Sequence, residues 1–261
     1  ATGTLQTSTT APFRIGAYHN VGPSYFSGQI RNVKVQGEFL LPVFDDSVSG
    51  IEATLKGGTT RTATGVVFNG VNGHADLNLD AKVMGGPMTI VGVIKWNALN
   101  LESRLFDCGN GASSNNIVVD IAATSGNLEW SIFQGSTQKK VTSPSSSDLI
   151  VGVRYHIVTT VSGTTMISYI NGVEMANITT GWEPTAMTRS KCYIGKSNWD
   201  TDGYLSGEVS SLKIYSGAMT QAQVTAAYRA LNLTNTTVTT AAPTAAPTAA
   251  PTAAPTAAPT A

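Results

Sequence analysis

Three oxygen-bearing side chains in one short segment have the spacing of ligands for a hard cation. Asn198, Asp200 and Asp202 alternate along the chain and a glycine follows them, as in the first half of an EF-hand calcium loop. That loop closes on a bidentate glutamate at its twelfth position, where this chain has Val209. The pattern predicts calcium as a cofactor. A polar turn between two strands is the alternative, because aspartate and glycine are common in turns.

Two tryptophans lie in segments that carry the signals of loops. Trp182 stands in Gly-Trp-Glu-Pro, and Trp199 lies between the first two candidate cation ligands. Sugar-binding sites combine an aromatic surface with a few polar groups, so both tryptophans are candidate sugar-binding residues. The alternative is that each indole packs over the edge of a sheet.

No catalytic motif is recognisable in the sequence. A glycosidase needs two carboxylates flanking the bond that it cleaves, and none of the seven glutamates is followed two residues later by an aspartate. The three histidines lie far apart along the chain, and neither a G-x-S-x-G nor an H-E-x-x-H motif occurs. We therefore expect a protein without enzymatic activity.

Cys108 and Cys192 are the two cysteines of the chain, and each lies at or near the glycine that bounds a predicted strand. An isolated pair normally closes in an oxidising compartment, which predicts a disulfide between strands far apart in sequence. Two free buried thiols are the alternative.

Asn177, Asn232 and Asn235 each begin an N-x-S/T sequon, and residues 241–260 are five copies of Ala-Ala-Pro-Thr. Proline at every fourth position removes amide donors and fixes φ, which predicts a polyproline II rod. We expect N-linked sugars on the three asparagines. We also expect O-linked sugars on the repeat threonines, namely Thr244, Thr248, Thr252, Thr256 and Thr260. A bare flexible spacer is the alternative for the tail.

Composition excludes two classes of partner. Lys and Arg total 16 and balance 16 Asp and Glu, so the chain lacks the basic surface of a nucleic-acid binder. No apolar run approaches the 18 residues of a membrane span, so we expect no membrane insertion. The sequons and the cysteine pair instead favour a secreted protein, outside the cell or on its surface, with glycans among its partners.

Short apolar runs bounded by Gly, Asn, Ser and Pro fill the middle of the chain and predict about a dozen strands. Asn171 and Gly172 give the signal of a type I′ hairpin turn. Residues 219–231 predict one short helix, in which Thr220 and Gln223 form a capping box. This pattern predicts an all-β protein, a sandwich of two antiparallel sheets with one C-terminal helix.

Residues 13–35 repeat the pattern of residues 192–214, with six identical positions and two glycines at the same places. We therefore interpret residues 1–38 as an N-terminal arm that resembles the closing hairpin of a preceding repeat. The sandwich then occupies residues 39–231, and the glycosylated repeat tail occupies residues 232–261.

Four segments carry a resemblance to a known family. They are FDDSVSGIEATLKGG, MTIVGVIKW, YINGVEM and the stretch from Tyr193 to Tyr228, in that order within residues 39–231. This series resembles laminin-G-like modules of the concanavalin A-like lectin and glucanase superfamily. The resemblance implies a jelly-roll sandwich but no particular activity, because that fold hosts lectins, glycosidases, adhesion modules and structural repeats.

These features together predict a non-catalytic structural glycoprotein, a repeating subunit of an extracellular fibre, filament or cell-surface appendage. The arm would pair with another copy of the chain in head-to-tail contacts, which do not close and therefore build filaments. The alternative function is a carbohydrate-binding or adhesion lectin module on a flexible stalk. Its site would contain Trp182, Trp199 and the loop around Asp200.

Overall fold

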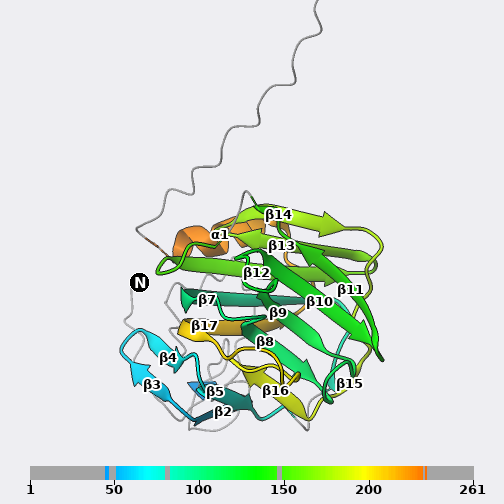
Figure 1. The fold of residues 1–261 in the computed structure, drawn as a ribbon. Helices are drawn as coiled ribbons and strands as arrows, with labels where there is room; N and C mark the ends of the chain where they lie inside the picture. The colour runs from blue at the N-terminus through cyan, green and yellow to red at the C-terminus, as the bar shows by residue number, and fades with distance from the viewer. Residues whose placement is uncertain (1–44, 47–50, 80–82, 146–148, 232, 234–261) are drawn as a thin grey trace, which may run out of the picture. The chain divides into compact units, whose positions relative to one another are not determined.

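The computed structural model describes residues 45–46, 51–79, 83–145, 149–231 and 233. Within these residues the chain forms seventeen strands and one short helix, and most strands belong to two large antiparallel sheets (Figure 1). The expected all-β sandwich is confirmed. The N-terminal arm, two of the three sequons and the repeat tail lie outside the described residues.

The larger sheet has eight strands among the described residues, and the register of each pair is antiparallel. In spatial order they are β1 (Asp45–Asp46), β2 (Ile51–Lys56), β5 (His74–Leu77), β16 (Lys191–Ile194), β8 (Arg104–Gly109), β9 (Ile117–Ile121), β10 (Leu128–Gln134) and β11 (Thr137–Thr142).

The second sheet has seven strands in the described part of the chain, and a small two-stranded sheet lies apart from both. The seven are β14 (Val173–Ile178), β13 (Thr165–Ile170), β12 (Arg154–Ser162), β7 (Met88–Ala98), β17 (Ser206–Ser216), β4 (Gly65–Asn69) and β3 (Thr59–Thr62). The small sheet pairs β15 (Met187–Thr188) with β6 (Val83–Met84).

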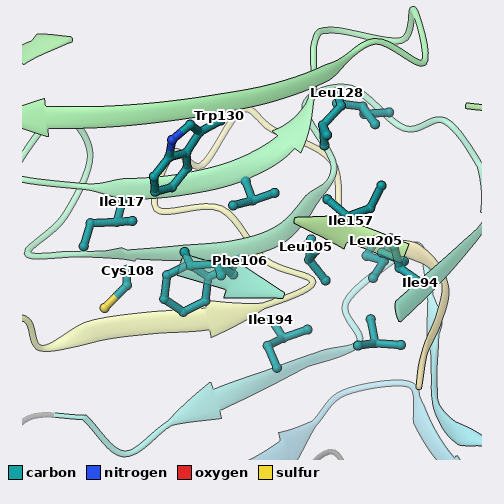
Figure 2. Close-up of a cluster of buried hydrophobic side chains, with 14 of the residues drawn as sticks. Ile94, Leu105, Phe106, Cys108, Ile117, Leu128, Trp130, Ile157, Ile194 and Leu205 are labelled. Carbon is teal, nitrogen blue, oxygen red and sulfur yellow. The ribbon is translucent and has the colours of Figure 1, made fainter. Parts of the chain in front are cut away.

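The hydrophobic core lies between the two large sheets. Figure 2 shows Ile117 of β9 and Leu128 and Trp130 of β10 in one cluster with Ile94 and Ile157 of the opposite sheet. All five side chains are almost completely buried. Each buried aliphatic or aromatic side chain contributes about 1.5–3 kcal/mol by leaving water, so this layer dominates the stability of the domain.

Side chains on β9 and β10 alternate between the core and the outer face of the eight-stranded sheet, as a period of two requires. Between the buried apolar residues stand Val118 and Asp120 on β9 and Glu129 and Ser131 on β10. This second set points away from the core. The strands therefore present a polar row on the outer face of the sheet.

A disulfide joins neighbouring strands within the core. Cys108 of β8 and Cys192 of β16 lie directly opposite each other in the register, with their Cα atoms 3.9 Å apart, and their sulfurs are bonded. Both side chains are buried. The bond closes a segment of 84 residues and fixes β16 to the middle of the eight-stranded sheet.

The helix α1 (Gln221–Ala230) is two residues shorter at its start and one shorter at its end than expected. Its capping box is present as predicted. The side chains of Thr220 and Gln223 each accept a hydrogen bond from the backbone N–H of the other residue. The hairpin turn also forms, with φ of 51° at Asn171 and 82° at Gly172, the positive values that a type I′ turn requires. Both local signals are confirmed.

Helix α1 covers part of the outer face of the seven-stranded sheet. Val224 is buried against Val91, Val158 and Tyr169 of that sheet. Among the described residues no helix is long and apolar enough to cross a membrane.

Replacing both cysteines with alanine tests the contribution of the disulfide. In the chain-entropy model, opening an 84-residue loop costs about 4–5 kcal/mol of stability. We expect the double variant Cys108→Ala/Cys192→Ala to lose free energy of unfolding of this size in urea titrations. A loss below about 1 kcal/mol would show that the cross-link adds little to the native state.

The buried His156 predicts a loss of stability in mild acid. It lies on β12 beneath α1, with its ring stacked on Tyr228 at 6.0 Å, and burial together with nearby Lys213 lowers its pKa to about 4. The unfolded chain takes up a proton near pH 6.5 and the folded chain does not, so stability is complete above that pH and falls as the pH drops toward 4.

The change between pH 7 and pH 5 should be about 2 kcal/mol from this group alone. Urea titrations of the wild type and of His156→Gln at both pH values measure it. The variant should show a smaller difference between the two pH values by about that amount. Equal differences in the two proteins would mean that His156 is not the group responsible.

Candidate functional site

Strand register brings charged side chains into one row on the outer face of the eight-stranded sheet. Arg104 of β8 lies opposite Asp120 of β9, which lies opposite Glu129 of β10. Residues opposite each other on neighbouring strands share a face, so these three side chains meet although they are far apart in sequence.

Arg104 is the centre of this row. Its side chain is 7% exposed, and its guanidinium forms an ion pair with Asp120 and a hydrogen bond of 2.6 Å to Asp202 Oδ2. The same group donates to Glu102 Oε2 at 3.4 Å and to Ser197 Oγ at 3.3 Å. Arg104 Nε also lies 3.8 Å from Asp107 Oδ2, so one buried cation serves residues from β8, β9 and two loops.

Glu129 has its own set of donors. Lys140 Nζ donates to Glu129 Oε2 at 2.9 Å, and Thr142 Oγ1 donates to the same oxygen at 3.0 Å. Ser131 Oγ donates to Oε1 at 3.3 Å. Since Lys140 and Thr142 lie on the last strand of the sheet, this network ties β10 to β11.

A buried aspartate holds the loop that follows β16. Asp107 of β8 is fully buried and accepts hydrogen bonds from the backbone N–H of Asn198 at 2.9 Å and from its side-chain amide at 2.8 Å. Asn116 donates to the same carboxylate at 3.0 Å. Burial raises the pKa of Asp107, and the hydrogen bonds from Asn198 and Asn116 oppose that shift. The start of the loop is thus fixed to the sheet.

Trp199 follows in this loop and is partly exposed. Its ring lies 5.5 Å from the ring of Phe133 on β10, and the guanidinium carbon of Arg104 lies 5.4 Å from the indole centroid. Its backbone N–H donates to Ser197 Oγ at 3.0 Å. The indole is therefore held in one orientation beside the charged row.

These groups enclose a hollow of about 510 Å³ on the outer face of β8 to β11. We call it the acidic hollow, and its main lining residues are Glu102, Arg104, Asp120, Glu129, Phe133 and Trp199. It combines aromatic rings with closely spaced hydrogen-bonding groups, which is the composition of a small-ligand site.

The carboxylate cluster is the part of the site that sequence patterns missed. One oxygen from each of Glu102, Asp120 and Glu129 lies within 4.8 Å of the others. Asp120 Oδ1 is buried and has no hydrogen-bond partner among the described residues. These oxygens could ligate a cation, but Arg104 already supplies positive charge to Glu102 and Asp120. The signal that could have found the cluster is strand register, which short motifs do not encode.

The predicted calcium ligands are engaged within the protein. Asp202 is paired with Arg104 and also accepts from Ser197 Oγ at 2.7 Å, while the Asn198 amide donates to Asp107. Asp200 is exposed. The calcium site stays a prediction. In the structure Asn198 and Asp202 hold the loop to the sheet through their hydrogen bonds.

The structure separates the two candidate sugar-binding tryptophans. Trp199 lines the acidic hollow, whereas Trp182 packs against the hydrophobic core. The Trp182 indole N–H donates to the carbonyl oxygen of Ile132 at 3.1 Å, and Lys139 lies over its ring at 5.5 Å. This is the packing arrangement that we gave as the alternative for a loop tryptophan.

The remaining predicted residues are distributed as follows. Asn177 is exposed on β14, and Cys108 and Cys192 are bonded in the core. Asn232, Asn235 and the repeat threonines lie outside the described residues.

A jelly-roll sandwich of two antiparallel sheets is the architecture of lectin domains, among other all-β proteins. The chain belongs to the concanavalin A-like lectin/glucanases superfamily, whose laminin G-type profile matches residues 69–225. The family resemblance read from the sequence is confirmed. No match to a curated protein was found.

Solved structures of similar fold include a domain in complex with an oligosaccharide. Domain 4 of an extracellular arabinanase from Geobacillus stearothermophilus, in complex with arabinotriose, has a TM-score of 0.56 and 21% identity. The similarity covers 71% of this chain and 92% of that domain.

Two further structures are larger proteins. A sialidase from Trypanosoma rangeli has a TM-score of 0.53 and 15% identity, over 70% of this chain and 30% of the sialidase. Botulinum neurotoxin type C, whose cell entry depends on two ganglioside molecules, has a TM-score of 0.52 and 17% identity, over 72% and 49% of the two chains. At these identities the likeness shows the fold alone.

Arg104→Ala should be strongly destabilising, because it leaves Asp120 and Asp202 without their buried counter-charge. We expect a loss of about 3 kcal/mol in free energy of unfolding, and a smaller loss for Arg104→Lys, which keeps the charge but not the forked geometry. Arg229→Ala, at an exposed position on α1, is the matched control and should cost less than about 0.5 kcal/mol. Similar losses at both arginines would contradict the central role of Arg104.

Proposed function

We propose that this protein is an extracellular carbohydrate-binding module that holds an uncharged glycan in the acidic hollow without cleaving it. The observation that carries this proposal is Trp199, a partly exposed ring fixed at the edge of a hollow rich in hydrogen-bonding groups. A sugar ring has apolar C–H faces and a polar rim. It can stack on the indole while its hydroxyls reach the carboxylates and the guanidinium.

The charge of the hollow favours a particular class of glycan. Its lining holds four carboxylates against two cationic side chains, since Asp202 and Lys140 join the charged residues of the row. An anionic sugar, such as a sialic acid or a sulfated sugar, would meet repulsion from this excess. Neutral sugars meet no such barrier, and their hydroxyls can donate to the carboxylate oxygens.

Binding without hydrolysis follows from the partners of the carboxylates. A glycosidase uses one protonated carboxyl group that gives its proton to the leaving oxygen. Here Glu129 accepts from Lys140, Asp120 and Glu102 accept from Arg104, and Asp202 accepts from Arg104 and Ser197. Each carboxylate accepts from a cationic or hydroxyl group of the network, which supports a binding role over a catalytic one.

The comparisons support the proposal at the level of ligand class. The similar domain of the arabinanase was solved with arabinotriose, a neutral oligosaccharide. The fold also occurs in a sialidase and in a neurotoxin whose cell entry depends on gangliosides. The excess of carboxylates in this hollow favours a neutral ligand over an anionic one.

The structural role expected from the arm and the tail depends on residues 1–38 and 232–261. Among the described residues none bears on filament formation, so the repeating-subunit role stays a prediction. The repeating-subunit role is compatible with sugar binding, because a lectin-like domain on a glycosylated stalk can bind the glycans of neighbouring chains.

The proposal predicts binding of neutral glycans that depends on Trp199. Arabinotriose and an array of neutral oligosaccharides serve as probes, and 3′-sialyllactose serves as the anionic probe. We expect calorimetric titration to show binding of at least one neutral probe and weaker or no binding of sialyllactose. Trp199→Ala should weaken binding by about tenfold, or 1.4 kcal/mol, because the stacking surface is lost.

Trp182→Phe is the matched control, since it changes a tryptophan outside the hollow. It should leave the affinity within about twofold of the wild type. Equal losses in the two variants, or preference for sialyllactose, would contradict the proposed site. Chromatography of the incubated glycan should show no new product, and release of shorter sugars would contradict the non-catalytic assignment.

A further inference from the structure

The seven-stranded sheet ends on β14, which pairs only with β13 among the described residues. An end strand presents free backbone N–H and C=O groups to solvent. Such groups can pair with a strand of another molecule, so stable proteins protect their sheet edges.

Other edges of the two sheets are protected by charge. β11 at the end of the eight-stranded sheet carries Lys139 and Lys140, and β3 at the other end of the seven-stranded sheet carries Arg61. Charged residues on an edge discourage pairing between molecules. β14 has the sequence Val-Glu-Met-Ala-Asn-Ile, in which Glu174 is the only charged residue.

Helix α1 is bonded to the turn that precedes β14. The side chains of Gln221 and Thr225 donate to the carbonyl oxygen of Gly172 at 2.7 and 3.0 Å, directly before the strand begins. Val173 beside them is 50% exposed. Asn177 lies four residues farther along β14, where the structure gives no hydrogen bond from α1.

Asn177 is placed where a bulky group would cover the edge of β14. It is exposed and lies opposite Ile167, which packs with the residues under α1, so Asn177 projects on the same face as the helix. Its amide nitrogen donates to Glu174 Oε1 at 2.7 Å. Asn177 and exposed Thr179, directly after the end of the strand, form a sequon.

We propose that Asn177 carries an N-linked glycan, and that this glycan protects the open edge of β14. The reaction needs a lipid-pyrophosphate-linked oligosaccharide as donor. The Asn177 amide nitrogen forms a bond to the anomeric carbon, the bond from that carbon to the phosphate oxygen breaks, the lipid pyrophosphate leaves and the amide loses one proton. No electron transfer is involved.

The core disulfide agrees with this modification. Cys108 and Cys192 are bonded, and protein disulfides form in the oxidising secretory route, where N-linked sugars are also attached. The glycan would be large relative to the six residues of β14, so one chain is enough to cover the open edge of the strand.

The site is tested on the full chain, secreted from a eukaryotic cell line. Trypsin releases residues 155–189 as one peptide, because no lysine or arginine lies between Arg154 and Arg189. We expect this peptide to carry a glycan in the wild type and in Thr179→Ser, which keeps the sequon. It should be bare in Asn177→Gln and Thr179→Ala. A bare wild-type peptide would overturn the assignment of the site.

Light scattering of the same proteins tests the protective role. Asn177→Gln and Thr179→Ala should contain oligomers at roughly threefold or more the wild-type fraction at equal concentration, because their edge is open. Thr179→Lys also removes the sequon but adds a positive charge directly after β14, so its oligomer fraction should stay at the wild-type level. Occupied wild type together with monomeric Asn177→Gln would overturn the protective role and leave only the modification.

Discussion

One buried guanidinium organises the outer face of the eight-stranded sheet. Arg104 lies among four carboxylates that come from β8, β9 and two loops, and their proximity would be unfavourable without it. A charge removed from water is stable only when its partners are close and well oriented, and the guanidinium meets this condition by bonding in several directions at once. The position of the Trp199 loop, and hence the shape of the acidic hollow, depends on this cation together with Asp107, which accepts from Asn198.

Local signals in the sequence were sufficient for much of the fold. The turn at Asn171 and Gly172 and the capping box at Thr220 each depend on a few adjacent residues, and both form as predicted. The two-sheet sandwich and its family also follow from alternation and from short segments in order. These features are recoverable because the physical cause, a φ preference or a period of two, lies within the segment itself.

The site was harder to predict because its residues meet only through pairing of distant strands. Glu129 stands alone in the sequence, yet β9 places Asp120 directly opposite it. Which strands are neighbours, and in which register, is decided by the whole core and not by any one motif. The two tryptophans show the same limit. Both lie in loops. Trp199 lines the hollow because the preceding residue, Asn198, is hydrogen-bonded to Asp107 of the sheet.

The loop between β16 and β17 is hydrogen-bonded to the sheet at two points, and its tip between them is exposed to solvent. Asn198 is bonded to Asp107 and Asp202 to Arg104, whereas Asp200 and Thr201 between them are exposed. Substitutions at the tip can therefore accumulate during evolution without disturbing either sheet. Related chains can therefore differ at these two positions while the scaffold beneath the loop is kept.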